Sequence, residues 1–194
     1  MLTNETAVNV WNKEPISSLI QKVHFKYLTT GLRSLSLLSE KKGEGKTTLA
    51  LSIAKGLTKV YNLKVLVVDL NPEGDTLLND LLKDYEFSKS KSGIVDKHPF
   101  DFGLFRIKNV DIDWLNQSYD TLYINQLISL LMNEYDLVIV DSMSSDGIEA
   151  RAIKASTDSY IVVTSKNSFG PLKLKLEQNL KTNNKNVLGV VFNK

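Results

Sequence analysis

The chain contains no cysteine, which excludes disulfides, thiolate metal sites and a cysteine nucleophile. No apolar run approaches the ~20 residues that a membrane-spanning helix requires. The first residues, Met-Leu-Thr-Asn-Glu-Thr, have neither the basic stretch nor the apolar segment of a secretory signal. The net charge is only +2, so the charge balance does not point to a nucleic-acid partner. We therefore expect a cytoplasmic chain that binds no nucleic acid, and that needs a partner or a missing segment if it is to reach the inner face of a membrane.

The remaining composition is ordinary for a globular protein, with 194 residues, 42% hydrophobic and 24% charged. We expect a loose lead-in at residues 1–14 and one domain with a full core at residues 15–194. Helical periodicity predicts helices at 16–32, 47–60, 76–85, 116–135, 147–156 and 171–182. Apolar runs predict strands at 34–39, 64–70, 104–107, 136–141, 159–164 and 186–192, and residues 86–102 are predicted to form a surface loop.

Strands that alternate with helices predict an α/β fold with a doubly wound, mostly parallel sheet and helices on both of its faces. Ligands of such sheets bind where the strands end. The ends of the strands at 34–39, 64–70 and 136–141 are therefore expected to share one crevice.

A glycine-containing turn follows the first predicted strand, and the next helix opens directly after it with Thr47 and Thr48. Glycine lets backbone N–H groups turn inward on an anion, and a helix N-terminus adds partial positive charge. Lys46 would supply a full charge toward the β- and γ-phosphates of a nucleotide, and the Thr47 hydroxyl would bind Mg²⁺. The usual pattern has glycine where this chain has Glu40, so the alternative is a polar turn that contains Gly-Lys-Thr by chance.

Two carboxylates, Asp69 and Asp141, come at the ends of apolar strands that are typical of a sheet interior. A carboxylate at that place can hold Mg²⁺, directly or through water, or accept a proton from an attacking group. The alternative for each residue by itself is a helix cap or a turn former. Beside a phosphate-binding loop, Asp141 is expected to be a magnesium ligand and Asp69 a catalytic carboxylate, whereas Asp136 is expected to cap the entry of its strand.

Four further residues leave alternatives open. Lys41 and Lys42 are either solvated charges or phosphate contacts, one of them across a dimer. Glu44 either faces solvent or reaches toward a partner subunit, and Asn193, at the end of the last strand, is a candidate for base recognition. The expected nucleotide-binding set is Lys41, Lys42, Gly43, Glu44, Gly45, Lys46, Thr47, Thr48 and Asn193, with Lys46 and Asp69 catalytic and Thr47 and Asp141 on the metal.

These segments resemble the deviant-Walker P-loop ATPases, the group that contains the ParA/MinD proteins and the bacterial tyrosine kinases (BY-kinases). The resemblance covers residues 23–194 and rests on five segments in the family's order. They are the Phe-Lys-Tyr-Leu helix at 25–28, the Ser-Glu-Lys-Lys-Gly-Glu-Gly-Lys-Thr-Thr loop at 39–48, the Walker A′ strand at 65–69, the Walker B strand at 135–141 and the closing Gly-Val-Val-Phe-Asn strand at 189–193. The resemblance implies a P-loop NTPase fold that binds Mg²⁺ with ATP or ADP.

Within the group, the helix before the loop and the Ser-Glu pair are similar to BY-kinases of capsule and exopolysaccharide systems. Lys41 falls at the signature-lysine position of ParA/MinD proteins, and Asn71-Pro-Glu-Gly is similar to their Asp-Pro-Gln-Gly. Three departures weaken the implied kinase activity. Asn71 replaces the second Walker A′ carboxylate, the ring-forming Glu-x-x-Arg-x-x-Arg motif falls on Val23, Lys26 and Thr29, and no tyrosine follows Tyr160.

The resemblance therefore implies an ATPase-like domain with weakened catalysis that regulates surface-polysaccharide synthesis or export. Its expected partners are ATP, a membrane protein of such a system and, with nucleotide bound, a second copy of the chain. Two alternatives remain open: a binding or scaffold module in which ATP sets the conformation without phosphoryl transfer, and a ParA/MinD-type partitioning or positioning ATPase.

Overall fold

The computed structural model describes residues 13–39, 41–70, 94–95, 101–106, 121–142, 148–165 and 186–193. The helices in these ranges are α2 (Ile16–Thr30), α3 (Lys46–Tyr61), α6 (Thr121–Leu131) and α7 (Ile148–Ser156). The strands are β1 (Ser34–Leu38), β2 (Val65–Asp69), β3 (Ile94–Val95), β4 (Gly103–Arg106), β5 (Leu137–Asp141), β6 (Ser159–Ser165) and β7 (Asn186–Asn193). The predicted helices at 76–85 and 171–182, and most of the 1–14 lead-in, lie outside the described residues.

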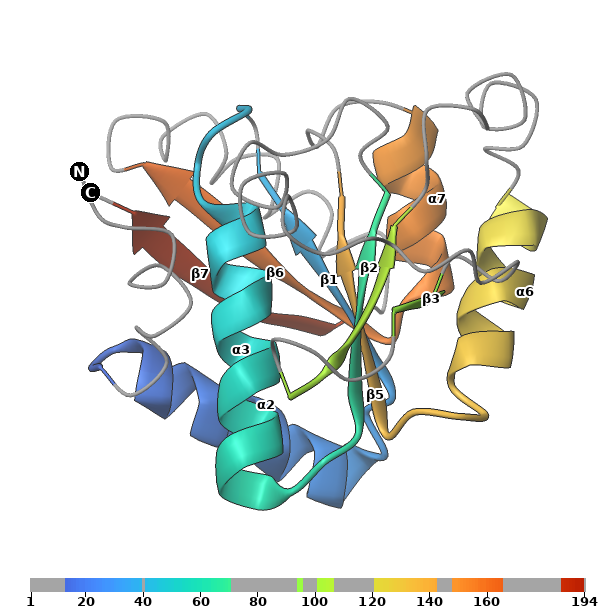
Figure 1. Cartoon of the computed structure of the whole chain (residues 1–194). Coiled ribbons are helices and arrows are strands. Elements are labelled where there is room, and N and C mark those ends of the chain that lie inside the picture. Colours follow the sequence, from blue (N-terminus) through green and yellow to red (C-terminus); the bar gives the residue numbers. More distant parts are fainter. Residues whose placement is uncertain are drawn as a thin grey trace.

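The described strands form one seven-stranded sheet in the order β3-β4-β2-β5-β1-β6-β7 (Figure 1). Its strand pairs are parallel, except that β3 runs antiparallel to β4. The expected mostly parallel α/β sheet is confirmed, and β2, β5 and β1 lie side by side as the shared crevice requires. The prediction of a loop throughout 86–102 is wrong at Ile94–Val95, which pair with Phe105 and Leu104 of β4.

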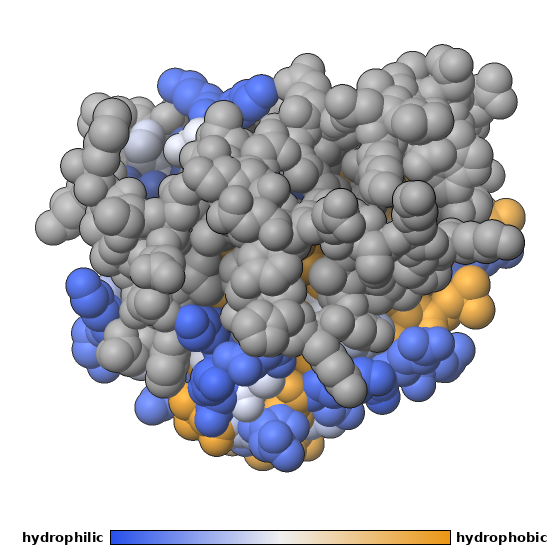
Figure 2. All heavy atoms as spheres, viewed as in Figure 1, coloured by the Kyte–Doolittle hydropathy of each residue, from blue (hydrophilic) through white to orange (hydrophobic). Residues whose placement is uncertain are grey.

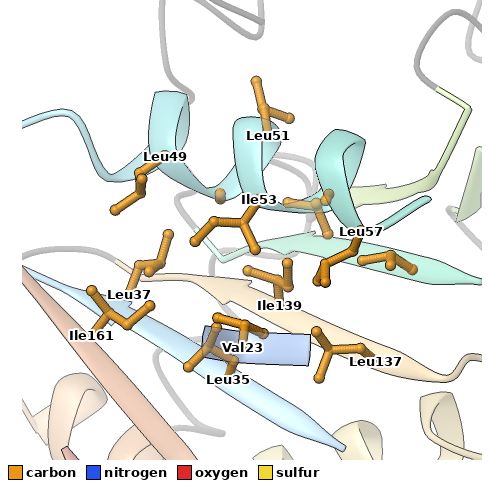
Figure 3. Close-up of a cluster of buried hydrophobic side chains, with 14 of the residues drawn as sticks. Val23, Leu35, Leu37, Leu49, Leu51, Ile53, Leu57, Leu137, Ile139 and Ile161 are labelled. Carbon is orange, nitrogen blue, oxygen red and sulfur yellow. The ribbon is translucent and has the colours of Figure 1, made fainter. Parts of the chain in front are cut away.

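Helices cover both faces of the sheet, because successive strand residues point to opposite sides. On one face, α2 and α3 pack over alternate residues of β1, β2 and β5 (Figure 3). On the other face, α6 and α7 pack over the intervening residues of β2 and β5. Thus Val67 and Ile139 contact the first layer, and Val68 and Val140 the second. Strands buried on both faces explain the nearly continuous apolar runs of the sequence.

Helix α6 ends before the predicted limit at residue 135. Beyond this end the backbone tightens, since the N–H groups of Asn133 and Glu134 each donate to the carbonyl oxygen three residues back. The Arg33 Nη2 atom donates hydrogen bonds to the carbonyl oxygens of Met132 (2.6 Å) and Tyr135 (2.8 Å), which supplies partners for carbonyl groups that a helix end leaves without one. The sequence predicts Leu122, Ile124, Leu127, Leu130 and Leu131 on the apolar side of this helix, but Leu122 and Leu130 are exposed, by 61% and 66%.

Exposed apolar side chains also lie on α2, where Phe25 and Leu28 occupy one outward-facing stripe. Figure 2 shows apolar surface at the lower edge and on the right-hand side of the same view. Within the described ranges, no helix combines the length and the apolar composition that crossing a membrane requires.

Candidate functional site

The loop between β1 and α3 turns through two glycines with left-handed backbone conformations. Gly43 has φ +84° and Gly45 has φ +93°, a region that side-chain-bearing residues reach only at a cost. Helix α3 begins directly afterwards at Lys46, so the first backbone N–H groups of the helix lie at this loop. The strand, glycine turn and helix predicted from the sequence are therefore all present, and the chance-turn alternative does not describe this geometry.

Lys46 is buried within the loop rather than extended into solvent. Its Nζ atom donates a hydrogen bond of 2.6 Å to Ser39 Oγ, which in turn donates one of 2.8 Å to the carbonyl oxygen of Lys41. Ser39 is fully buried at the end of β1. The serine thus holds the ammonium group beside the loop in the conformation seen here.

Thr47 lies beside the end of the central strand β5. Its Oγ1 atom donates a hydrogen bond of 2.5 Å to Asp141 Oδ2. Asp141 is in register with Asp69 on β2 and with Leu37 on β1, and both aspartates are buried. Three neighbouring strands and the first turn of α3 therefore bring one hydroxyl, two carboxylates and the Lys46 ammonium to the same edge of the sheet.

A hydroxyl beside a carboxylate fits the oxygen ligands that Mg²⁺ prefers, and a nearby ammonium fits a phosphate. Among the described residues, no group of three or more His, Cys, Asp or Glu side chains could hold a metal ion by itself. This donor set suits Mg²⁺, because magnesium in phosphate sites is held by few protein ligands together with waters and phosphate oxygens.

Glu44 follows neither alternative considered from the sequence. Its side chain is buried, with Oε2 accepting a hydrogen bond from the backbone N–H of Lys41 (3.0 Å) and Oε1 accepting one from that of Ser165 (3.2 Å). Its carbonyl oxygen accepts a third bond, of 3.0 Å, from Asn193 Nδ2. Asn193 therefore lies against the loop, and its amide would be only 2.7 Å from a Cβ atom built on Gly45.

The other predicted residues are placed less centrally. The side chains of Lys41 and Lys42 are exposed at the loop. Thr48 is half-buried in the first turn of α3, and its carbonyl oxygen accepts a bond of 2.7 Å from Ser52 Oγ. Asp136 is predicted to cap the entry of its own strand, and its carboxylate instead accepts a bond of 2.8 Å from the backbone N–H of Lys64, directly before the neighbouring strand β2.

Three serines of the site were given no role by the sequence. Ser39 contacts Lys46, Ser165 contacts Glu44, and Ser142 Oγ donates a hydrogen bond of 2.6 Å to the carbonyl oxygen of Leu37. The position of Ser39, directly after a buried strand and before the glycine turn, was a usable signal. Nothing local marks Ser165, because its contact with Glu44 joins residues 121 positions apart.

A separate cavity of about 650 Å³ lies at the other edge of the sheet, where β2 and β4 begin. Its charged groups are engaged with neighbours. Lys59 Nζ lies 2.7 Å from Asp101 Oδ2, and Lys64 Nζ lies 4.7 Å from the centre of the Tyr135 ring. The candidate site is therefore the edge of the sheet beside the loop between β1 and α3, called the loop edge below.

Solved structures with a similar fold include the chimerical protein CapA2B2, with a TM-score of 0.70 and 19% identity over 97% of this chain and 89% of that one. The kinase domain of Escherichia coli tyrosine kinase ETK also has a TM-score of 0.70, with 21% identity over 88% of this chain and 71% of that one. The septum site-determining protein MinD with Mg-ADP, from Pyrococcus horikoshii OT3, has a TM-score of 0.59 and 22% identity over 82% and 69% of the two chains. At these identities the likeness shows the fold.

Sequence comparison identifies a relative and a family. The virulence plasmid ParA family protein pGP5-D of Chlamydia psittaci is 29% identical over 181 residues, which cover 83% of this chain and 69% of that protein. The model of the CobQ/CobB/MinD/ParA nucleotide binding domain matches residues 35–194, which include every strand described above apart from the first residue of β1. The chain belongs to this family of nucleotide-binding domains and, as its resemblances predicted, to the deviant P-loop ATPases that share the fold of ParA/MinD proteins and BY-kinases.

Proposed function

We propose that the chain binds ATP and ADP together with Mg²⁺ at the loop edge of the sheet. The observation that carries this proposal is the hydrogen bond between Thr47 and Asp141 beside the buried Lys46 ammonium. The backbone of residues 43–48 would hold the phosphates, and Lys46 would exchange Ser39 for a phosphate oxygen. Thr47 would ligate Mg²⁺ and Asp141 would hold it through water. The ion would neutralise the charge of the β- and γ-phosphates.

The proposed reaction is slow hydrolysis of ATP. Asp69 is a buried carboxylate in register with Asp141 on the neighbouring strand. In this proposal it would accept a proton from an attacking water. Asn71, which lies outside the described residues, stands where the family has a second carboxylate, and an amide cannot act as a general base. Weak turnover follows from that replacement.

Calorimetric titration of the protein with ADP and Mg²⁺ tests the binding. We expect binding in the wild type, a loss of at least about 100-fold in Lys46→Ala, since a charged contact to phosphate is removed, and no change in Lys59→Ala. The control removes the same charge from the opposite end of α3. Equal binding by the wild type and Lys46→Ala contradicts the proposed site.

Phosphate release from ATP tests the reaction. Turnover that rises in Asn71→Asp supports an attenuated ATPase. Tight binding with no turnover in either form favours the nucleotide-dependent binding module instead.

For the cellular role, we propose that the chain regulates surface-polysaccharide synthesis or export through a membrane-protein partner. The support is the helix that precedes the loop and the likeness in fold to CapA2B2 and to the ETK kinase domain. Deletion of the gene in its native host should reduce cell-surface polysaccharide, and the wild-type gene should restore it whereas Lys46→Ala should not. Unchanged polysaccharide in the deletion strain contradicts this output.

A second candidate is a ParA-type positioning ATPase, favoured by the 29% identity to a ParA family protein and by the exposed Lys41 at the signature-lysine position. It requires an ATP-dependent homodimer. Light scattering with ATP and Mg²⁺ would then show a dimer that Lys41→Ala abolishes. A monomer under all conditions, or a dimer that Lys41→Ala leaves intact, contradicts this candidate.

A further inference from the structure

Glu44 is an acidic residue in a loop built for an anion. A carboxylate directed at the phosphates would oppose their binding, and a buried carboxylate is costly unless it is hydrogen-bonded. Both oxygens of Glu44 are instead engaged with backbone N–H groups, one from Lys41 within the loop and one from Ser165 at the end of β6. The carboxylate of Glu44 therefore links the loop to the end of β6.

The backbone of Glu44 makes a further contact with a distant strand. Asn193 Nδ2 donates to the carbonyl oxygen of Glu44, and Asn193 is the last residue of β7. Glu44 therefore joins the loop to the ends of β6 and β7, two strands on the far side of β1 from Asp69 and Asp141. Other attachments of the loop include its covalent ends in β1 and α3 and the contacts of Ser39.

We propose that Glu44 is a positioning residue. Its carboxylate fixes the turn from Lys41 to Glu44, including the left-handed Gly43, so that the backbone N–H groups face the phosphates before any nucleotide arrives. This role rests on the proposed nucleotide binding and replaces the expectation that Glu44 itself contacts the nucleotide. A loop that is already ordered binds more tightly, because binding does not have to supply the ordering entropy.

Two substitutions separate this role from others. Glu44→Gln keeps the shape and one acceptor oxygen but puts an NH₂ group where the second N–H bond is accepted, whereas Glu44→Ala removes both acceptors. The loss of one charge-assisted bond to a part-buried N–H weakens binding about tenfold, and the loss of both about 100-fold. We therefore expect ADP–Mg²⁺ affinity to fall about tenfold in Glu44→Gln and about 100-fold in Glu44→Ala. Glu134→Gln, which removes the same charge from an exposed position before β5, should bind like the wild type.

Calorimetry is combined with amide hydrogen exchange of Lys41 and Ser165 in the nucleotide-free protein. Both amides should be protected in the wild type and Glu134→Gln, and should exchange faster in the two Glu44 variants. Tighter binding by Glu44→Gln would show that the carboxylate acts by repelling phosphate, and this overturns the proposal. A lower melting temperature with unchanged affinity would show a purely structural role and also overturns it.

The failure of the proposed function is recognised separately. If the wild type binds no ADP, the nucleotide site itself is wrong. If the wild type binds ADP and both Glu44 variants bind it equally well, only the positioning role is wrong.

Discussion

Gly45 has a backbone conformation that an alanine adopts only at a cost in free energy. It also lies close to the side chain of Asn193. Its φ of +93° lies in the region where an L-residue loses about 1–2 kcal/mol. A Cβ atom at this position would lie 2.7 Å from Asn193 Nδ2, so the asparagine would have to move and give up its hydrogen bond to the Glu44 carbonyl. The lost bond adds about 1 kcal/mol.

The substitution Gly45→Ala should therefore destabilise the binding conformation of the loop by about 2–3 kcal/mol, which weakens ADP–Mg²⁺ binding roughly 30- to 150-fold. Gly43→Ala is the matched control. Gly43 has a similar φ of +84° but nothing within 4 Å of an added Cβ atom. It should lose only the backbone part, about 1–2 kcal/mol or roughly 5- to 30-fold in affinity.

A double-mutant cycle with Asn193→Ala isolates the contact. Calorimetric affinities of the wild type, both single variants and the Gly45→Ala/Asn193→Ala double variant give the coupling energy. We expect about 1 kcal/mol of coupling, because the hydrogen bond between Asn193 and Glu44 can be lost only once. Additive effects within about 0.3 kcal/mol, together with equal losses in Gly43→Ala and Gly45→Ala, would refute the reasoning.

Three further predictions concern the metal, the sheet and the helix layer. Thr47→Val removes the hydroxyl that binds Asp141, so ADP affinity should no longer depend on Mg²⁺; an equal response of variant and wild type to EDTA in titrations would contradict this. Asp158→Ala removes the acceptor of two backbone N–H groups at the start of β1 and should lower the free energy of unfolding by about 1–3 kcal/mol without changing ADP affinity, and an unchanged urea midpoint would argue against it. In Gly56→Ala, the added Cβ would lie 2.3 Å from Ile20 Cδ1, so overpacking of about 1–3 kcal/mol should outweigh a helix-propensity gain of about 1 kcal/mol. Ile20→Val in the same chain should relieve it, whereas additive urea results would mean that α2 and α3 do not pack this closely.

Most of the sheet could be predicted because a strand buried on both faces carries its signal in its own residues. The runs at β2 and β5 are apolar at every position between their polar ends, since both helix layers contact them. The pair Ile94–Val95 is too short to carry such a signal, and its pairing depends on β4 being beside it. The surroundings of the end of α6 could not be predicted for a similar reason, because the side chain that binds the carbonyls of Met132 and Tyr135 comes from Arg33, about 100 positions away.

For the site, local sequence alone determined the glycine turn, the helix that begins at Lys46, and the aspartates at the ends of β2 and β5, because each depends on propensities within a few residues. Tertiary structure decided which of these groups meet. The strand order places β5 between β1 and β2, and this brings Asp141 to Thr47 and into register with Asp69. It likewise turned Glu44 inward to Ser165, and Asn193 onto the loop, across 121 and 149 positions of sequence. Such contacts depend on how the crossovers order the strands, and that order is a property of the whole sheet.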